Sequence, residues 1–330
     1  MDNITHSFTG AALSKYLHTK TEDEETLAAW RRTLFWLMVG CVNLPDADVL
    51  VGAFTDPITA TQQHRGLSHS VLFAPIFALL PTAIWYVLSK LKDFKLLWIT
   101  ATIGIYVHIL FDLVTSYGTQ LLQPFDDTRY SLDLMFIIDP FFTIPLGIIL
   151  LMHKLKKNRE WAVFGVVYMV GYLLLLGVTQ SMARENLKLF TKSDLTRSAA
   201  LPQPLNPFAH MGLVRTEVGV ERYFYSGSDF DLRKRFFIDS QNVYTRHALA
   251  SNEGHWCFNF SRFPHVISET KGDTTFVRIF DMQFSFDEEL AAKLGFEARQ
   301  IPFAMEFNYA PNAQLRHVRF NGKLLDTTRS

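Results

Sequence analysis

The sequence predicts a membrane α-helical bundle followed by a small β-rich extracytoplasmic domain. Long uncharged apolar runs fill residues 1–180, whereas the last third of the chain alternates aromatic and β-branched residues with turn pairs. The mean hydropathy of +0.09 is high for a soluble protein and low for one that is membrane throughout. A membrane part and a soluble part within 330 residues account for both observations.

Four runs approach the ~20 apolar residues that the hydrocarbon core of a bilayer demands. They cover residues 71–89, 96–117, 134–152 and 161–179. Residues 33–45 form a shorter and equally apolar run, which extends to about Val51 if its acids are tolerated. Residues 4–17 are rich in small side chains, which suit packing inside a bundle. We therefore expect four complete helices and two shorter segments.

The residue composition of the sequence changes beyond Gln180. Residues 181–204 are predicted to be a polar helical and proline-rich linker, which runs into PQPLNPF at residues 202–208. From about residue 205 to 330, runs such as ERYFYSG, TTFVRIFDMQFSF and LRHVRFNGKLL alternate with turn pairs such as Lys271-Gly272-Asp273. Alternation bounded by turn residues is typical of strands and hairpins, so this part is expected to be a soluble β-rich domain.

The positions of lysine and arginine predict the orientation. The loops after the first and third long runs carry Lys90, Lys92 and Lys95, and Lys154, Lys156, Lys157 and Arg159. Loops on the opposite side hold only Arg65 and Arg129. Because cytoplasmic loops carry the excess of positive charge, we expect an integral, multi-pass protein of the cell (inner) membrane whose C-terminal domain is extracytoplasmic.

Histidines and aspartates from separate segments are predicted to meet at the outer membrane face. His108 and Asp112 are four residues apart and so share one face of a helix. The other candidates at this face are His6, Asp46, Asp48, His64 and His69. A lone membrane histidine is usually a packed, hydrogen-bonded residue, but imidazoles and carboxylates together suit zinc, manganese or iron. Ionisable groups in membrane segments are also costly, so we expect the set to bind metal.

Other classes of function fit the composition less well. A net charge of zero gives no basic field for nucleic acid. Cys41 and Cys257 lie far apart, which excludes a disulfide framework and CxxC metal spacing. The N-terminus lacks a basic region followed by an apolar one, so no cleaved signal peptide is expected. A transporter and a non-catalytic metal-binding scaffold stay open as alternatives, although transporter sites usually lie near the midplane between repeated halves.

The segments MDNITH, LPDAD, HRGLSHS and HILFDLVTSYGTQLLQPF stand in this order along the chain. In order and spacing they resemble the YdjM-type family of bacterial membrane-bound metal-dependent hydrolases. The resemblance covers residues 1 to 180 strongly and is fainter over SRFP and FDMQF in the β-rich tail. It implies a metal-dependent hydrolase with motif positions at His6, Asp46, Asp48, His64, His69, His108 and Asp112. Position 68 is Ser where relatives have Thr, and either residue offers a hydroxyl.

A looser similarity is to the all-helical zinc phospholipase C and P1-nuclease group. Those enzymes place an early His, a mid-chain Asp, a further His and an HxxxD helix around a zinc cluster. This sequence lacks a counterpart to their later His and Glu ligands. The expected cofactor is therefore one or two divalent ions, zinc in the first place, with manganese or iron as alternatives.

The expected chemistry is hydrolysis of an ester, in particular a phosphoester, by water activated at the ions. A lipid-linked substrate fits this place, and the bilayer itself is the expected partner. Arg65 and Asp48 are expected to take part in catalysis, Arg65 by clamping a phosphate with its planar fork. Arg65 could equally anchor the helix end at the headgroup layer. The alternative is a metal-binding membrane scaffold or transporter without hydrolytic activity.

Neighbouring polar residues have two open roles each. Thr115, Ser116 and Tyr117 could orient ligands from outside the metal sphere or cap a helix before Gly118. Asp139 could orient a ligand histidine or hold Arg129.

Overall fold

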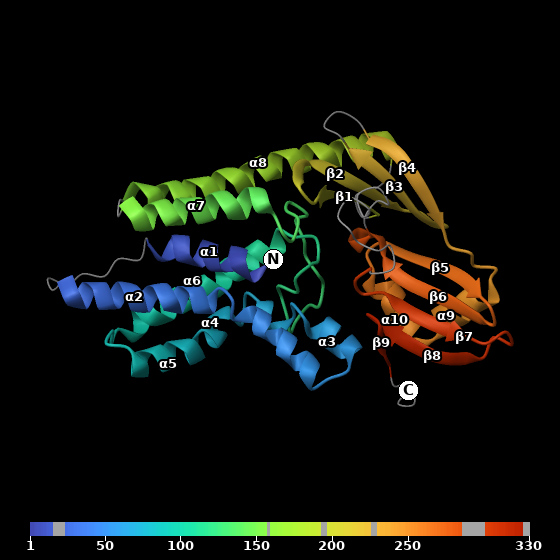
Figure 1. Cartoon of the computed structure of the whole chain (residues 1–330), viewed down its shortest axis with the longest axis horizontal. Coiled ribbons are helices and arrows are strands. Elements are labelled where there is room, and N and C mark those ends of the chain that lie inside the picture. Colours follow the sequence, from blue (N-terminus) through green and yellow to red (C-terminus); the bar gives the residue numbers. More distant parts are fainter. Residues whose placement is uncertain (16–23, 157–158, 193–196, 226–229, 286–300, 326–330) are drawn as a thin grey trace. The chain divides into compact units, whose positions relative to one another are not determined.

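The computed structural model describes residues 1–15, 24–156, 159–192, 197–225, 230–285 and 301–325. Lys157 of the predicted cytoplasmic loop lies outside these residues. The chain divides into two compact units (Figure 1). The first contains Met1–Thr55, Thr59–Met182 and Pro202–Phe208, and the second contains Asp56–Ile58, Ala183–Leu201 and Ala209–Ser330.

The first unit is built from long helices that run side by side (Figure 1). They are α1 (Asn3–Ser14), α2 (Glu24–Cys41), α6 (Phe94–Leu113), α7 (Pro140–Lys156) and α8 (Arg159–Thr191), of which α8 belongs to this unit as far as Met182. The side chain of Asp2 caps α1 by accepting from two backbone N–H groups, and Asp93 caps α6 in the same way with one. Helix α1 packs against α2, α6 and α7, so its His6 is carried into the middle of the bundle.

Two glycines let α2 and the residue that follows it approach α1 and α6 closely. A Cβ at Gly104 of α6 would lie 2.9 Å from the Cβ of Cys41, and a Cβ at Gly10 of α1 would lie 2.7 Å from a methyl group of Val42. Neither contact leaves room for a side chain. This close packing brings the backbone carbonyl of Val42 within hydrogen-bond reach of His108.

Two helical stretches within the described residues are long and apolar enough to cross a membrane, α6 and Glu160–Thr191. A third span is present if the bent pair Pro57–His69 and Ala74–Leu88 counts as one. This is fewer than the four complete spans expected from the sequence.

Helix boundaries account for the difference. The run expected at residues 71–89 is divided into α4 (Ala74–Phe77), which has Pro75 in its first turn, and α5 (Leu79–Leu88), which contains Pro81. The 85° bend lies before α4, between Pro57–His69 and Ala74–Leu88. The run expected from residue 134 becomes helical only at Pro140, which leaves α7 with 17 residues. Proline lacks the N–H that continues a helix and fits best at the first helical positions.

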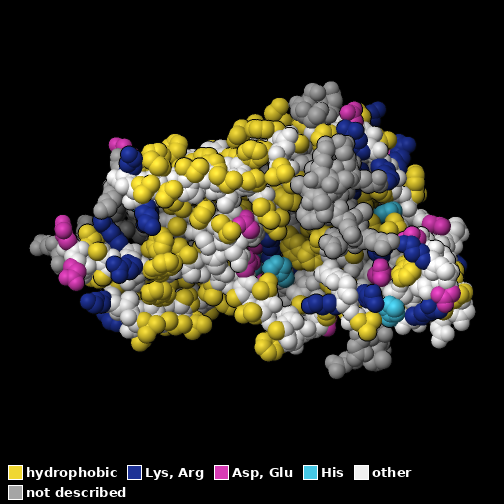
Figure 2. All heavy atoms as spheres, in the orientation of Figure 1, with side chains coloured by type: hydrophobic (Ala, Val, Ile, Leu, Met, Phe, Trp, Pro, Cys, Tyr) yellow, Lys and Arg dark blue, Asp and Glu magenta, His cyan; other side chains and the backbone are white. Residues whose placement is uncertain are grey.

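The flank of the helical unit is apolar (Figure 2). Exposed apolar side chains on α7 and α8 include Ile144, Ile148, Leu151, Val167, Val170 and Leu174. Lys and Arg side chains gather at the end of the unit where α2 begins and α7 ends, at the left of Figure 2. An apolar flank with a charged end is typical of a protein that sits in a bilayer.

The second unit is dominated by two antiparallel sheets, which confirms the expected β-rich part. One sheet has the order β1 (Ser198–Gln203), β2 (Asn206–Arg215), β3 (Gly219–Tyr225), β4 (Phe230–Phe237). The other has the order β5 (Pro264–Lys271), β6 (Thr274–Asp281), β7 (Met305–Tyr309), β8 (Leu315–Phe320), β9 (Lys323–Leu324). Helices α9 (Val243–Ala250) and α10 (Asn252–Phe260) stand between the two sheets in sequence.

Strand structure begins earlier than the sequence suggested. β1 starts at Ser198, inside residues 181–204 that were expected to form a linker, and α8 continues to Thr191. The reason is packing, because Ala183 and Leu187 near the end of α8 join a buried cluster with Ala200 of β1 and Val214 of β2. The turn at Gly272 has φ +59° and joins β5 to β6, as its turn residues predicted.

Candidate metal centre

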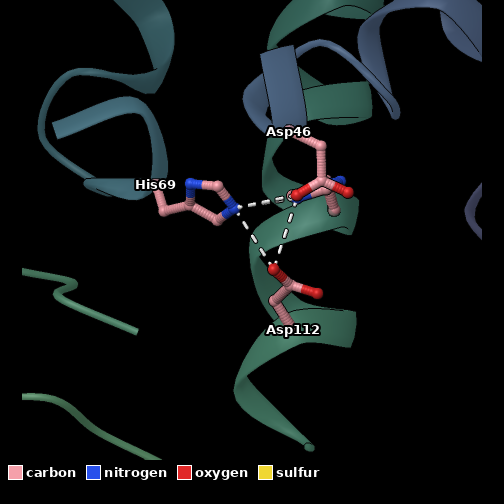
Figure 3. Close-up of side chains that lie close together, drawn as sticks. Asp46, His69 and Asp112 are labelled. Atoms are coloured by element: carbon pink, nitrogen blue, oxygen red, sulfur yellow. Dashed lines mark hydrogen bonds and ion pairs between the residues drawn. The ribbon is translucent and has the colours of Figure 1, made fainter. Parts of the chain in front are cut away.

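Four side chains from three segments converge in the helical unit. Asp46 comes from the 3₁₀ segment η1 (Pro45–Ala53), His69 from η2 (Leu67–His69), and His108 and Asp112 from successive turns of α6. Each offers one ligand atom, and these four atoms lie within 4.8 Å of one another. Figure 3 shows Asp46, His69 and Asp112 pointing toward one another from their separate segments. We call these four residues the quartet.

The hydrogen bond of His108 to the backbone determines where its proton lies. His108 Nδ1 is 2.8 Å from the carbonyl oxygen of Val42. A carbonyl only accepts, so Nδ1 carries the hydrogen and donates it. Nε2 of the neutral ring therefore presents a lone pair to the centre of the quartet.

His69 is held in the same state by a short chain of hydrogen bonds. Ser68 Oγ lies 2.8 Å from Asp48 Oδ2 and 2.8 Å from His69 Nδ1. The hydroxyl has one hydrogen, which it donates to the carboxylate, so it must accept from His69 Nδ1. His69 Nε2 is then also a bare lone pair.

The quartet thus brings together groups that all accept. The Nε2 atoms of His69 and His108 are 3.0 Å apart, and Asp112 Oδ2 lies 3.2 Å from the first and 3.5 Å from the second. Asp46 Oδ1 is 3.5 Å from His108 Nε2 and 3.7 Å from His69 Nε2. Two lone pairs facing each other repel unless a cation lies between them. Two imidazoles and two carboxylates, each imidazole anchored through its other nitrogen, are a donor set that fits a divalent metal ion.

Asp112 is the most heavily contacted carboxylate of the quartet. Its Oδ1 accepts from the amino group of Met1 and lies 3.3 Å from His6 Nε2. Its Oδ2 lies 2.8 Å from Arg65 Nε. The His6 ring also stacks on His108, with centroids 4.0 Å apart. His6 is therefore beside the quartet, against two of its members, rather than one of the four.

Asp48 and His64 form a pair on the other side of His69. His64 Nδ1 lies 2.8 Å from Asp48 Oδ1, and the other carboxylate oxygen accepts from the backbone N–H of Arg65 at 3.0 Å. Burial raises the pKa of Asp48, but the hydrogen bond and charge of His64 outweigh it and leave that pKa below its usual value. Asp48 is thus an ionised group that holds the loop from His64 to His69 in shape.

Arg65 is buried, and the described contacts of its side chain turn it inward. Only 3% of the residue is exposed, and its backbone has φ +59°, in the left-handed region. Nη1 donates to Thr115 Oγ1 at 3.0 Å, and the guanidinium lies over the Tyr117 ring at 4.9 Å. These contacts fix Arg65 against Asp112, and its role as a phosphate clamp stays a prediction.

Two of the neighbouring residues, Thr115 and Asp139, make contacts that bear on the roles left open for them. Thr115 both donates to the carbonyl of Asp112 at 2.8 Å and accepts from Arg65, so it links a helix end to the centre. Asp139 instead accepts from the N–H groups of Phe141 and Phe142 at the start of α7 and from the hydroxyl of Tyr172.

Sequence reasoning brought all seven predicted ligand residues to one place but did not rank them. The structure places four in the quartet, His6 against Asp112 and His108, and the Asp48–His64 pair behind His69. It also adds Val42, whose contribution is a backbone carbonyl. Every residue has a carbonyl, so the sequence held no signal for it. Ser68 was visible in HRGLSHS, but its bond to His69 depends on the fold of the loop.

Comparisons with known proteins point to one family. A family model described as YdjM inner membrane protein matches residues 1–183. The Bacillus subtilis (strain 168) protein titled "Uncharacterized protein YfhP" is 29% identical over 144 residues, 44% of this chain and 43% of that protein. "Inner membrane protein YbcI" of Escherichia coli (strain K12) is 32% identical over 114 residues, 32% of this chain and 64% of that protein.

These matches are partial. The aligned stretches cover less than two thirds of the length of either relative. No solved structure matches the chain, and the looser similarity to the zinc phospholipase C group finds no support in the comparisons.

Proposed function

This chain belongs to the YdjM inner membrane protein family, and we propose that it is a membrane-bound, metal-dependent hydrolase. The proposed substrates are esters, in particular phosphoesters, and the proposed cofactor is one or two divalent ions. Zinc suits two imidazoles and two carboxylates, and manganese or iron are the alternatives.

One observation carries the proposal. The Nε2 atoms of His69 and His108 face each other at 3.0 Å, with carboxylate oxygens of Asp46 and Asp112 beside them. A divalent cation satisfies all four groups, and the hydrogen bonds to Val42 and Ser68 hold both rings ready for it.

Each residue then has a separate task. A divalent ion at this place supplies a Lewis acid that lowers the pKa of a water molecule and polarises an ester oxygen. The quartet would hold the ion, Arg65 would orient Asp112, and Asp48 would orient the loop that carries His69. His6, Asp48 and His64 are the nearby groups available to a second ion.

The exposure of Asp46 supports catalysis over a purely structural site. Its side chain is 17% exposed, whereas those of His69, His108 and Asp112 are 0% exposed. A structural site is closed by protein ligands, while a catalytic site keeps a position for water. The quartet therefore has an accessible side at Asp46. A metal-binding scaffold or a transporter would bind the same ion without hydrolysing an ester.

The membrane orientation is a further part of the proposal. The lysine loops are placed in the cytoplasm, so the quartet and the C-terminal sheets are placed outside it. Substrates would then be esters at the outer face of the inner membrane.

The test combines metal analysis with hydrolysis by the purified full chain in detergent. We expect bound zinc, manganese or iron, hydrolysis of bis(p-nitrophenyl) phosphate, and loss of both in Asp46→Asn. The control is Asp127→Asn, the same change at an exposed loop residue, which should keep both. Bound metal without hydrolysis of phosphoesters or carboxyl esters would favour the scaffold or transporter, and absence of metal would refute the proposal.

A further inference from the structure

The segment that supplies Asp46 carries a run of exposed apolar side chains next to the metal ligand. Val49 and Leu50 of η1 are 60% and 65% exposed, and Phe54 just after it is 89% exposed. No charged residue occurs from residue 49 to residue 55. Leu67, between His64 and His69, is exposed as well.

The length of α6 gives the depth at which these side chains lie. Its 20 residues rise about 30 Å, which equals the thickness of a bilayer's hydrocarbon core. Asp112 is the last residue but one of α6, so the quartet lies at the edge of that core. Asp46 Oδ1 is 3.5 Å from His108 Nε2, which places η1 at the same level.

Apolar side chains at this level are covered by lipid rather than water. Exposed patches of Leu, Val and Phe are rare on surfaces that face water, whereas segments lying in the membrane interface bury such side chains among the acyl chains. Exposed apolar side chains also occur on the next elements along the chain, Leu72 before α4 and Ile76 within it. Helix α4 contacts η2, and η2 contacts η1, so these side chains lie on neighbouring elements.

We propose that the metal centre takes its substrate from the lipid phase, as an amphiphile whose phosphoester reaches the quartet while its hydrocarbon chain stays beside η1. This inference rests on the proposed hydrolase function. The accessible side of the quartet is at Asp46, and Asp46 and the exposed Val49 and Leu50 are at most four residues apart on one short segment. A water-soluble phosphoester would gain nothing from that apolar surround.

The first arm of the test measures the depth of η1 without using activity. A cysteine at Phe54→Cys is labelled with the environment-sensitive dye NBD in full-length protein in phosphatidylcholine–phosphatidylglycerol vesicles. Cys41 and Cys257 are buried, so labelling is directed to the new thiol. We expect a blue-shifted emission that nitroxide-labelled lipid quenches, as for Val167→Cys on α8. The dye at the exposed turn residue Asn312→Cys should stay unquenched. A dye at residue 54 that behaves like the one at residue 312 would overturn the inference.

The second arm compares substrates. The metal-loaded protein is given a diacyl phospholipid in vesicles and, separately, soluble bis(p-nitrophenyl) phosphate. For Phe54→Ser the ratio of lipid to soluble turnover should fall about tenfold or more, because a buried Phe contributes at least that factor. Phe54→Leu, which stays apolar, should keep most of the ratio. An unchanged ratio in Phe54→Ser, or hydrolysis of the soluble ester alone, refutes the lipid inference and leaves the hydrolase. Hydrolysis of neither substrate by the metal-loaded protein refutes both.

Discussion

His69 and His108 face each other through Nε2 atoms 3.0 Å apart, and in the neutral form of each ring the hydrogen bond at Nδ1 leaves Nε2 as a lone pair. The Nδ1–H of each ring donates a hydrogen bond, from His108 to the carbonyl of Val42 and from His69 to the hydroxyl of Ser68. Such an approach is stable only around a positive charge. The two side chains come from different segments, so the fold itself builds this close pair.

Removing one imidazole should therefore cost the metal and spare the fold. In His69→Ala we expect metal affinity to fall by more than about 100-fold, beyond the effect of losing an outer partner. Apolar packing around Leu37, Leu97 and Ile105 does not involve this site and should keep the helices folded. Metal content after dialysis, with circular dichroism as the check on folding, measures this. Full metal content in a folded His69→Ala protein would remove His69 from the centre.

Ser68 offers a finer test because only its hydroxyl matters. In Ser68→Ala the Nδ1 proton of His69 loses its acceptor, and metal affinity should fall about 10- to 100-fold. Ser68→Thr keeps the hydroxyl and should restore affinity to near the original. Competition with a chelator of known affinity gives the numbers. Equal loss in both variants would point to a packing effect instead.

Arg65 should behave as a positioning residue. Arg65→Lys keeps the charge but loses the fork that contacts Asp112 and Thr115 together, so metal affinity should fall about 10- to 100-fold. Arg129→Lys is the matched control, because Arg129 lies over the same Tyr117 ring but donates to carbonyls of the neighbouring loop. If Arg65→Lys kept its metal and only the KM for a phosphoester rose, Arg65 would be a substrate clamp.

The orientation in the membrane can be measured with reporter fusions. Because Lys90, Lys92 and Lys95 are predicted to be cytoplasmic, a reporter joined after Asp93 should be active only if it works inside the cell. A reporter joined after Ser330 should be active only if it works outside the cytoplasm. Reversed signals would place the metal centre in the cytoplasm.

The β-rich unit should lose stability in mild acid through one buried histidine. Burial, and then the charges of Arg222 and Lys234, lower the pKa of His265 to about 4 from 6.5. Between pH 6.5 and pH 4, His265 binds a proton in the unfolded chain but stays neutral in the folded chain. The free energy of unfolding therefore decreases as the pH falls through this window, by up to about 3 kcal/mol.

His265→Phe keeps an aromatic ring beside Phe236 and Phe280 and removes the titration. Hydrogen exchange of the β5 and β6 amides between pH 7 and pH 4, corrected for the intrinsic pH dependence of exchange, reports the change. The variant should lose less protection in acid than the original protein. Equal losses would assign the acid sensitivity to another group.

Helix α6 and the β5–β6 hairpin show which parts of the fold a sequence can predict. The i, i+4 spacing of His108 and Asp112 was enough to place both on one face of α6, because helix geometry is local. Local patterns also indicated the β5–β6 hairpin through Gly272. The division of residues 71–89 into α4 and α5 was not predicted, since hydropathy counts apolar residues and ignores where proline interrupts a turn.

The candidate metal centre also has features that the sequence predicts and features that depend on packing. Residue types and topology brought seven side chains to one end of the bundle. They could not separate the quartet from His6, Asp48 and His64, because that distinction depends on distances of an ångström set by packing. Gly10 and Gly104 illustrate this, since they decide how near Val42 comes to His108 and carry no chemical signal of their own.

The quartet draws its ligands from residues 46, 69 and the 108–112 turn, so an ion held there cross-links three stretches of chain that are far apart in sequence. Like any ligand that binds only the folded form, it would add free energy to folding, about 2.7 kcal/mol at a concentration one hundred times its dissociation constant. The lifetime of the protein in the cell would then follow the supply of free metal around it. A shortage of metal would then lead to proteolysis of the metal-free protein before a loss of hydrolytic turnover was detectable.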